Sequence, residues 1–226
     1  MGRIEELQNA KRVRNATVLE EVLTSDAHQI HETLADMKQE VFDLACDTIC
    51  RGRDIYVIGV RNCAPLAELL AFYLNTIFEH VRLVHTNSAS EIYEQMLHVN
   101  ERDVVIGISF PRYSMRVLKA LEFANSRSAK VIALTDTQHS PMNLYSSCNL
   151  LAKSELSTIV DSMVAPLSVI NALVIALSLR KKQKVLDNLE TLDRVWEDYP
   201  VDTHDEINQL DPDMQLIPRK GERQDA

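Results

Sequence analysis

The chain contains 226 residues, of which 46% are apolar and 25% are charged, a balance typical of a globular protein with a sizeable core. Its net charge of −9 argues against a domain whose main surface binds nucleic acid, although such a domain can belong to a larger DNA-binding protein. Residues 1–14 are rich in charge, and the apolar stretch 163–179 is interrupted by Pro166 and polar residues. These features argue against a signal peptide and a membrane span, so a cytoplasmic protein is expected.

The chain has four cysteines and seven histidines, and neither set has the spacing of metal ligands. Reduced thiols are the simplest interpretation of the cysteines, which are Cys46, Cys50, Cys63 and Cys148. We therefore expect no metal site and no cofactor.

Helical periodicity dominates the N-terminal part of the chain. Residues 1–16 are polar and form a linker-like start, whereas residues 17–51 contain little glycine or proline and repeat apolar residues at helical spacing. Two helices are predicted there, with a break near 35–38 where Asp36 is expected to cap the second helix. Leading helices of this kind pack on a sheet or on a partner subunit.

Short apolar runs then alternate with amphipathic segments. The runs are typical of buried strands and cover 54–59, 81–85, 103–109, 130–135 and 148–152. Helices are predicted between them, at about 64–78, up to about 98 and at 115–125. This alternation predicts a parallel sheet with helices on both faces.

The C-terminal part changes composition twice. Residues 153–161 are polar and are placed to close over the strand ends, and 160–199 follow as one long helix or two shorter ones. Beyond Pro200 the chain is polar, so residues 200–226 are predicted to be a disordered tail. One domain is therefore expected over residues 17–199, with its leading and trailing helices.

The stretch 103–114 combines the features of an anion-binding turn. A buried strand ends at Ser109, and a helix with one apolar face begins directly after Ser114. Arg112 and Tyr113 lie between them. Unpaired backbone N–H groups and the positive end of the helix dipole favour an anion at such a position. We predict that this turn binds a phosphate.

Polar turns also follow the neighbouring strands. Arg61, Asn62 and Cys63 come after the first strand, and Ser88 lies in the loop after the second. Residues 136–140 follow the fourth strand. Because ligands of parallel sheets bind at the carboxyl ends of the strands, these turns are expected to meet at one edge. The turns after the first and third strands also resemble each other, since each has an arginine before a helix.

Each candidate also has a simpler interpretation. Ser109 and Ser114 are favoured helix caps, a role whose geometry is compatible with phosphate binding. Arg112 can be a solvated surface residue, but its guanidinium suits a bidentate contact with phosphate or carboxylate. Arg61 can equally pair with one of the many carboxylates.

For four further side chains, the sequence gives weaker evidence of a functional role. Cys63 opens a helix, but no partner His or Asp lies near it in sequence, which favours a packed residue over a nucleophile. Tyr113 either stacks on a ligand ring or covers the turn. Glu155 and Asp161 flank a polar segment, and a general base for an isomerisation would be a residue placed in this way.

The motifs resemble those of a known family. Gly59–Cys63, followed by a Pro-Leu-Ala helix start, resembles the first phosphate-side turn of a sugar isomerase (SIS) domain. Ser109-Phe-Pro-Arg-Tyr-Ser114 resembles the second, Ser/Thr-rich turn, and the 130–136 strand with its Ser-Pro sequence is similar to the next segment. Over about residues 17–185, the chain is similar to the sugar-phosphate-sensing half of MurR/RpiR-type bacterial transcriptional regulators.

The resemblance implies a fold, an assembly and a ligand. The fold would be a three-layer αβα sandwich with a five-stranded parallel sheet, assembled as a homodimer or homotetramer. The ligand would be a phosphorylated sugar or sugar acid. The residues implied to hold it are Ser109, Arg112, Tyr113 and Ser114, with Arg61, Asn62, Cys63 and Ser88 around the same pocket.

The sequence departs from the family pattern in both turns. SIS domains commonly have Gly-x-Gly-x-Ser in the first turn, where Arg61 and Cys63 stand here. They commonly have Ser-x-Ser-Gly-x-Thr in the second, where Pro111 and Arg112 replace the inner Ser-Gly. Two guanidinium groups thus stand where small residues usually allow backbone amides to approach the phosphate. This suggests either that arginine side chains hold the phosphate instead or that the ligand is more acidic.

Regulators of this type normally carry a helix-turn-helix domain before the SIS domain, and residues 1–50 contain no recognisable helix-turn-helix. DNA contact is therefore expected only through a domain absent from this chain. The alternatives are a stand-alone sugar-phosphate isomerase or lyase, with Glu155 as the catalytic candidate, and an assembly module with a vestigial pocket.

Overall fold

A computed structural model of the chain describes residues 17–85, 88–157 and 160–198. Contacts between residues divide the chain into two compact units, Met1–Val185 and Leu186–Ala226. The sheet and the candidate site belong to the first unit. The predicted linker-like start and the predicted disordered tail lie outside the described residues.

The first unit is built on a parallel sheet of five strands in the order β2-β1-β3-β4-β5. The strands are β1 (Ile55–Gly59), β2 (Val81–Leu83), β3 (Val104–Ile108), β4 (Lys130–Thr135) and β5 (Cys148–Leu151). The five apolar runs of the sequence thus correspond to the five strands. Strand β1 and strand β3 are buried along their whole length, as expected for the centre of a sheet covered on both faces.

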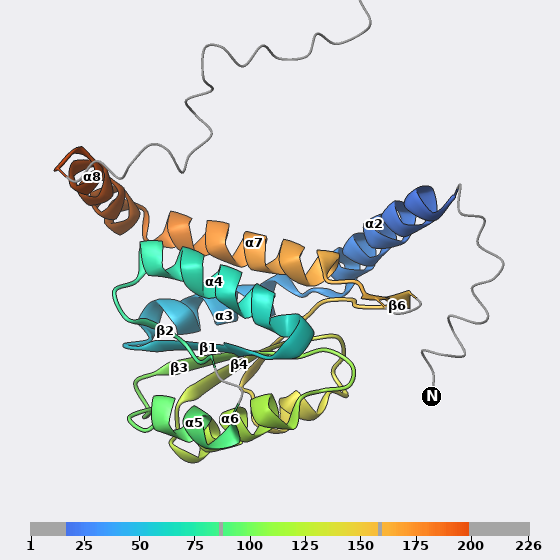
Figure 1. Cartoon of the computed structure of the whole chain (residues 1–226), viewed down its shortest axis with the longest axis horizontal. Coiled ribbons are helices and arrows are strands. Elements are labelled where there is room, and N and C mark those ends of the chain that lie inside the picture. The colour runs from blue at the N-terminus through green and yellow to red at the C-terminus, as the bar shows by residue number, and fades with distance from the viewer. Residues whose placement is uncertain (1–16, 86–87, 158–159, 199–226) are drawn as a thin grey trace, which may run out of the picture. The chain divides into compact units, whose positions relative to one another are not determined.

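Helices cover both faces of the sheet, which confirms the predicted three-layer arrangement (Figure 1). Helices α3 (Gln39–Arg51), α4 (Ala64–Ile77) and α7 (Val164–Arg180) lie on one face. The shorter α5 (Ala89–Gln95) and α6 (Met115–Ser126) lie on the other. The chain therefore leaves the sheet in opposite directions after β1 and after β3.

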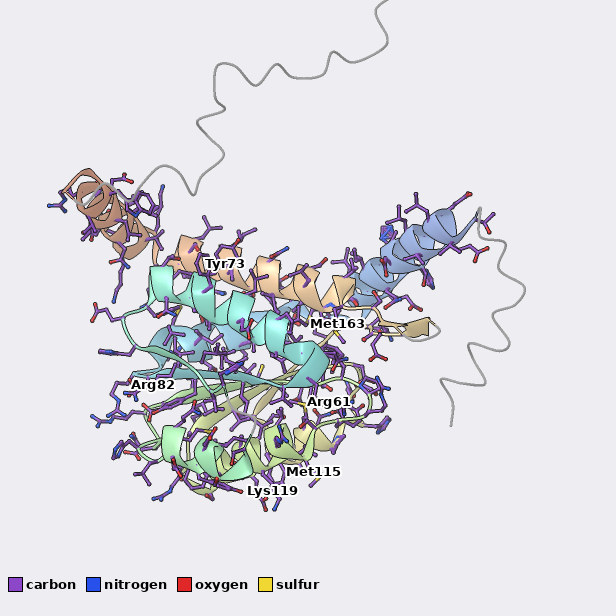
Figure 2. All side chains as sticks on the ribbon, viewed as in Figure 1. Arg61, Tyr73, Arg82, Met115, Lys119 and Met163 are labelled. Carbon is purple, nitrogen blue, oxygen red and sulfur yellow. The ribbon has the colours of Figure 1, made fainter. Side chains whose placement is uncertain are left out.

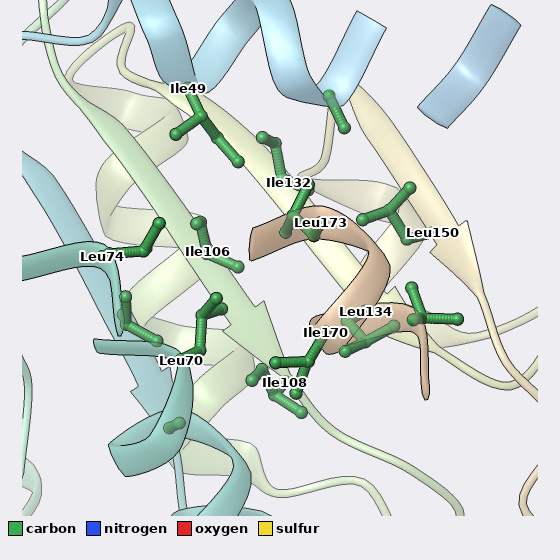
Figure 3. Packing of buried hydrophobic residues seen from close by; sticks show 14 of the residues in the cluster. Ile49, Leu70, Leu74, Ile106, Ile108, Ile132, Leu134, Leu150, Ile170 and Leu173 are labelled. Atoms are coloured by element: carbon green, nitrogen blue, oxygen red, sulfur yellow. The ribbon is translucent and has the colours of Figure 1, made fainter. Parts of the chain in front are cut away.

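Two apolar clusters hold these layers together, because successive strand residues point to opposite faces. Ile106 and Ile108 of β3 pack with Leu70 and Ile170 in the larger cluster, which Figure 3 shows from close by. Val105, the residue before Ile106, belongs to the cluster under α5 and α6. The central strands are thus fixed by apolar packing, which leaves the polar turns at their ends outside the core.

The leading helices are α2 (Val18–Asp36) and α3, and the break between them falls at Met37–Lys38, as predicted. The capping role expected for Asp36 is wrong. Asp36 is the last residue of α2, while the N-cap position of α3 is Lys38, which has no side-chain cap. The chain becomes extended only at Met37, so Asp36 lies too early to cap α3 and instead pairs with Lys153 at 2.8 Å.

The polar segment after β5 contains two short strands, β6 (Leu156–Ser157) and β7 (Val160–Asp161), which pair in antiparallel fashion. Strands of two residues are too short to produce an alternating pattern, so the sequence did not indicate them.

Two helices follow the short strands, α7 and α8 (Lys182–Asp198), which agrees with the two-helix option. Among the described residues, no single helix is long and apolar enough to cross a membrane; only α7 and α8 taken together as a bent pair reach that length and composition.

Candidate functional site

The strand order defines a topological switch point between β1 and β3. The chain passes from β1 to β2 on one side and then returns to β3 on the other side of β1. Gly59 and Ile108 are paired at the carboxyl ends of these two strands. In open parallel sheets the crevice at such a point is where ligands bind, because the flanking connections diverge there. The two arginine-bearing turns follow these two strand ends and therefore lie at the same edge of the sheet.

The turn after β1 is a single 3-10 turn, Arg61–Cys63, which leads directly into α4. Glycine is required at position 59, because a Cβ at this residue would lie only 2.6 Å from the Cys63 carbonyl oxygen. Arg61 is exposed, and Figure 2 places it on the same side of the view as Met115 and Met163. The turn therefore presents Arg61 at the edge of the sheet from which α6 begins.

Cys63 is buried beneath this turn, with 3% of its surface exposed. Burial raises the pKa of its thiol to about 11, against a smaller opposite effect of the Phe110 backbone N–H. The thiol is thus protonated at neutral pH and packs between the two turns. This agrees with the prediction that Cys63 is a packed residue rather than a nucleophile.

The turn after β3 is held by its own serines. The buried Ser109 accepts a hydrogen bond at its hydroxyl from the Ser114 backbone N–H, at 3.2 Å. The Ser114 hydroxyl accepts one from the Arg116 N–H at 3.3 Å, which makes Ser114 the N-cap of α6. Both serines therefore act as the helix-capping interpretation proposed, and they orient the start of α6 towards the crevice.

Tyr113 extends this turn towards β4. Its hydroxyl donates to Asp136 Oδ1 at 2.7 Å, and Asp136 also accepts from the Thr135 hydroxyl at 3.2 Å. Burial and then this hydrogen bond raise the pKa of Tyr113 to about 12. Tyr113 therefore ties the second turn to residue 136 of the next strand end.

Asp161 is bonded to both turns; the sequence had indicated it only as an acid flanking a polar segment that could reach the site. Its Oδ2 atom accepts a hydrogen bond from the Arg112 guanidinium at 2.6 Å and another from the Asn62 amide at 3.0 Å. The Asp161 side chain is 11% exposed, and that of Arg112 is 46% exposed. One carboxylate oxygen thus receives a donor from each side of the crevice.

The two arginines also share a backbone conformation. Arg61 has φ of 59° and Arg112 has φ of 67°, both in the left-handed region. Such a conformation costs a residue other than glycine about 1–2 kcal/mol. These are the positions at which the SIS pattern commonly has glycine. The chain therefore keeps a glycine-like backbone in both turns while gaining a guanidinium in each.

Two other candidates take different positions. The Ser88 hydroxyl lies 2.8 Å from that of Ser90, at the start of α5. The Glu155 side chain is exposed, and its backbone N–H donates to Gln29 Oε1 at 3.1 Å. The carboxylate that reaches the turns is that of Asp161, six residues further on.

A polar cavity of about 340 Å³ lies beside this site, at the carboxyl ends of β4 and β5. It is lined by the polar residues after the two strands and by the end of α2: Asp136, Thr137, Gln138, His139, Leu151, Ala152, Lys153, Thr33 and Asp36. Its volume lies within the range of small-molecule sites, roughly 300–1,000 Å³. The contribution of α2 was not predicted, because its two residues are more than 100 positions away in the chain.

Among residues 17–85, 88–157 and 160–198, no group of three or more His, Cys, Asp or Glu side chains is arranged to hold a metal ion. The candidate site therefore consists of two arginines, amide and hydroxyl donors and one bridging carboxylate. Such a donor set binds anions.

Residues 49–176, more than half of the chain, match the SIS domain family. The chain therefore belongs to the SIS domain family. It is also 24% identical, over 185 residues, to an uncharacterised HTH-type transcriptional regulator of Caldanaerobacter subterraneus. This match covers 79% of the chain but only 64% of the length of that relative.

Solved structures agree with this assignment. The sugar isomerase domain of an RpiR transcription factor from Sphaerobacter thermophilus is similar with a TM-score of 0.75 and 25% identity, covering 79% of this chain and 99% of that one. Vibrio vulnificus NanR in complex with ManNAc-6P is similar with a TM-score of 0.71 and 16% identity, covering 85% of this chain and 72% of that one. The second likeness concerns the fold.

Proposed function

We propose that the chain binds a phosphorylated sugar or sugar acid between the turns after β1 and β3, as the effector-sensing part of an RpiR-like transcriptional regulator in the cytoplasm. The observation that carries this proposal is the convergence of Arg112 and Asn62 on one oxygen anion, that of Asp161. The match to an HTH-type regulator and the likeness to the RpiR domain support the regulatory role.

The phosphate would bind where the site offers the most hydrogen-bond donors. Arg112 and Arg61 would supply guanidinium groups, and the first turn of α6, capped by Ser114, would supply the positive end of a helix dipole. Ser109 accepts the Ser114 N–H and so helps to hold that turn in shape, while its O–H can donate to the ligand. Side-chain clamping would thus replace part of the backbone cradle that glycines allow.

The sugar would extend from there towards the polar cavity. Asp136 is adjacent to the second turn through Tyr113 and also lines the cavity, together with His139 and Lys153. These side chains offer acceptors and donors for sugar hydroxyls or a sugar carboxylate.

DNA contact would belong to a helix-turn-helix domain outside the residues described here. The net charge of −9 fits a sensing domain better than a DNA-binding surface. A homodimer or homotetramer is the proposed assembly, and exposed apolar side chains on α4 and α7 support it: Phe72, Tyr73, Ile175 and Leu179. Size-exclusion chromatography with light scattering tests the assembly.

A thermal-shift screen against a panel of sugar phosphates tests the ligand. Arg112→Ala should weaken binding by about 10- to 100-fold, because a hydrogen bond to a charged group contributes about 1.5–3 kcal/mol. Arg112→Gly should weaken binding equally while stabilising the free protein relative to Arg112→Ala, since glycine adopts the left-handed conformation without strain.

Arg127→Ala is the matched control, because Arg127 is an exposed arginine at the far end of α6 that stacks on Phe123. It should leave binding unchanged. No response to any sugar phosphate, or an unchanged response in Arg112→Ala, would contradict the proposal.

An isomerase would need a base positioned at the sugar carbon chain. The Glu155 side chain is exposed, and Asp161 is engaged by two donors. Sensing is therefore the better-supported function. Turnover of a bound sugar phosphate that is lost in Glu155→Gln would reverse this preference.

A further inference from the structure

Asp161 occupies the position of an anion that the site is built to bind. Its carboxylate oxygen is the common acceptor of Arg112 and Asn62, which come from opposite sides of the crevice. A guanidinium binds carboxylate and phosphate oxygens with the same geometry. Arg112 makes this contact from a left-handed backbone conformation, with φ of 67°.

We propose that Asp161 is an internal competitor of the ligand: in the free protein it fills the anion-binding donors, and a phosphate must displace it to bind. This inference rests on the proposed function and assigns the regulation of the same site. Asp161 thereby lowers the affinity of the site for any phosphorylated ligand. It therefore sets the ligand concentration at which the site becomes occupied.

Displacement of Asp161 would be transmitted to α2, because residues 153–155 and Ser162 are joined to one face of that helix by polar contacts. Four such contacts are present: Ser162 Oγ donates to Asp26 Oδ1 (2.6 Å), the Glu155 N–H to Gln29 Oε1 (3.1 Å), the Lys153 N–H to Thr33 Oγ1 (2.9 Å), and Lys153 Nζ pairs with Asp36 (2.8 Å). The α2 residues are spaced three, four and three apart, which places them on one side of the helix.

The segment is also bonded to itself, so a shift at Asp161 reaches these contacts directly. Ser162, the next residue, donates its N–H to the Glu155 carbonyl at 3.1 Å, and its own carbonyl accepts from the Ser154 hydroxyl at 2.9 Å. Asp161 therefore belongs to a closed loop of hydrogen bonds whose other side is α2.

The contacts between α2 and this segment are polar, and polar contacts can separate and form again at low cost. Gln29 and Thr33 are the only buried residues of α2 among those described, and both are polar. When polar contacts separate, water replaces the lost hydrogen bonds, whereas separated apolar contacts leave surface that water does not favour. Ligand binding would thus loosen or shift α2 where these polar contacts hold it.

The test titrates wild type, Asp161→Asn and Asp161→Ser with inorganic phosphate and measures the affinity of each by calorimetry. Removing the internal carboxylate should tighten phosphate binding by about two- to fivefold, the scale of a partly exposed ion pair. Glu122→Gln removes the same charge from the exposed face of α6 and should leave the affinity unchanged. In an Arg112→Ala background, Asp161→Asn should give no gain, because the donor is gone.

A second readout follows the two amides that donate to α2. Hydrogen exchange at the Lys153 and Glu155 N–H groups should accelerate in wild type saturated with phosphate, and in Asp161→Asn without any ligand. Unchanged exchange in both states would overturn transmission to α2.

The outcomes separate the two proposals. If wild type binds sugar phosphates but Asp161→Asn binds inorganic phosphate no more tightly than wild type does, the proposal that Asp161 competes with the ligand is wrong and the proposed function stands. If Asp161→Asn binds phosphate and wild type does not, the competitor is supported. If no variant binds either phosphate or sugar phosphate, both proposals are wrong.

Discussion

At the scale of single residues, the turns after β1 and β3 each have an arginine where SIS domains commonly have glycine, and the left-handed backbone conformation is retained. Arg61 and Arg112 both adopt a backbone conformation that favours glycine, and both are exposed. Gly59 permits the close approach of the first turn, and Ser109 anchors the second. The positions of the guanidiniums therefore follow from the turns and not from the arginines themselves.

The buried thiols predict how stability depends on pH. Burial raises the pKa of Cys148 from 9.0 to about 11. Below about pH 9 the thiol is protonated in both states, so its contribution to stability is fully present. Above that pH the unfolded chain loses the proton first, and the contribution is lost as the pH rises through about 11.

Thermal melts of wild type between pH 8 and 11 should therefore show a falling melting temperature, and Cys148→Ala should show a smaller fall over the same range. A wild-type fall no steeper than that of Cys148→Ala would contradict the assignment.

At the scale of elements, α2 is unusual because it docks through polar side chains. The apolar residues of its N-terminal half, including Leu19 and Leu23, are exposed, while Gln29 and Thr33 are buried. Each of these two accepts a backbone N–H from the segment after β5. The helix is thus positioned by hydrogen bonds to a loop near the candidate site.

Thr33→Val keeps the shape of the side chain and removes the acceptor of the Lys153 N–H. The free energy of unfolding should fall by about 1–3 kcal/mol, the cost of leaving a buried donor unpaired. Thr24→Val is the matched control, because Thr24 is exposed on the same helix and the change in helix propensity is the same. Urea denaturation of both variants measures the difference; equal losses would show that the contact contributes nothing.

At the scale of the whole molecule, the first unit contains all that the proposed site needs. The five strands, both apolar clusters and the two turns lie before residue 186. In the second unit, the described part of α8 exposes its apolar side chains: Leu186, Leu189, Leu192, Val195 and Trp196.

A chain that ends at Val185 should therefore fold and keep its affinity for sugar phosphates within about twofold, since the unit boundary removes no core residue. Circular dichroism and the thermal-shift screen measure folding and binding. Loss of the cooperative melt would contradict the unit boundary.

Local patterns in the sequence determined the architecture of the sheet. β-branched runs and helical periodicity are set by the residues themselves, so the five strands and the helices between them were predictable. The parallel order then brought the turns after β1 and β3 to one edge without further information. The proposed roles of the eight ligand-binding residues stay predictions.

Contacts between distant segments were decided only by the tertiary structure. Asp161 lies 49 residues from Arg112 and 99 from Asn62, and the Lys153 N–H meets an acceptor 120 residues away. Hydrogen bonds of this kind depend on how the layers pack, and no local pattern encodes their partners. The sequence by itself therefore determined a parallel sheet with two arginine-bearing turns at one edge. Only the tertiary structure supplied the carboxylate that joins Arg112 to Asn62 and the polar contacts that connect it to α2, because packing places these groups and periodicity does not.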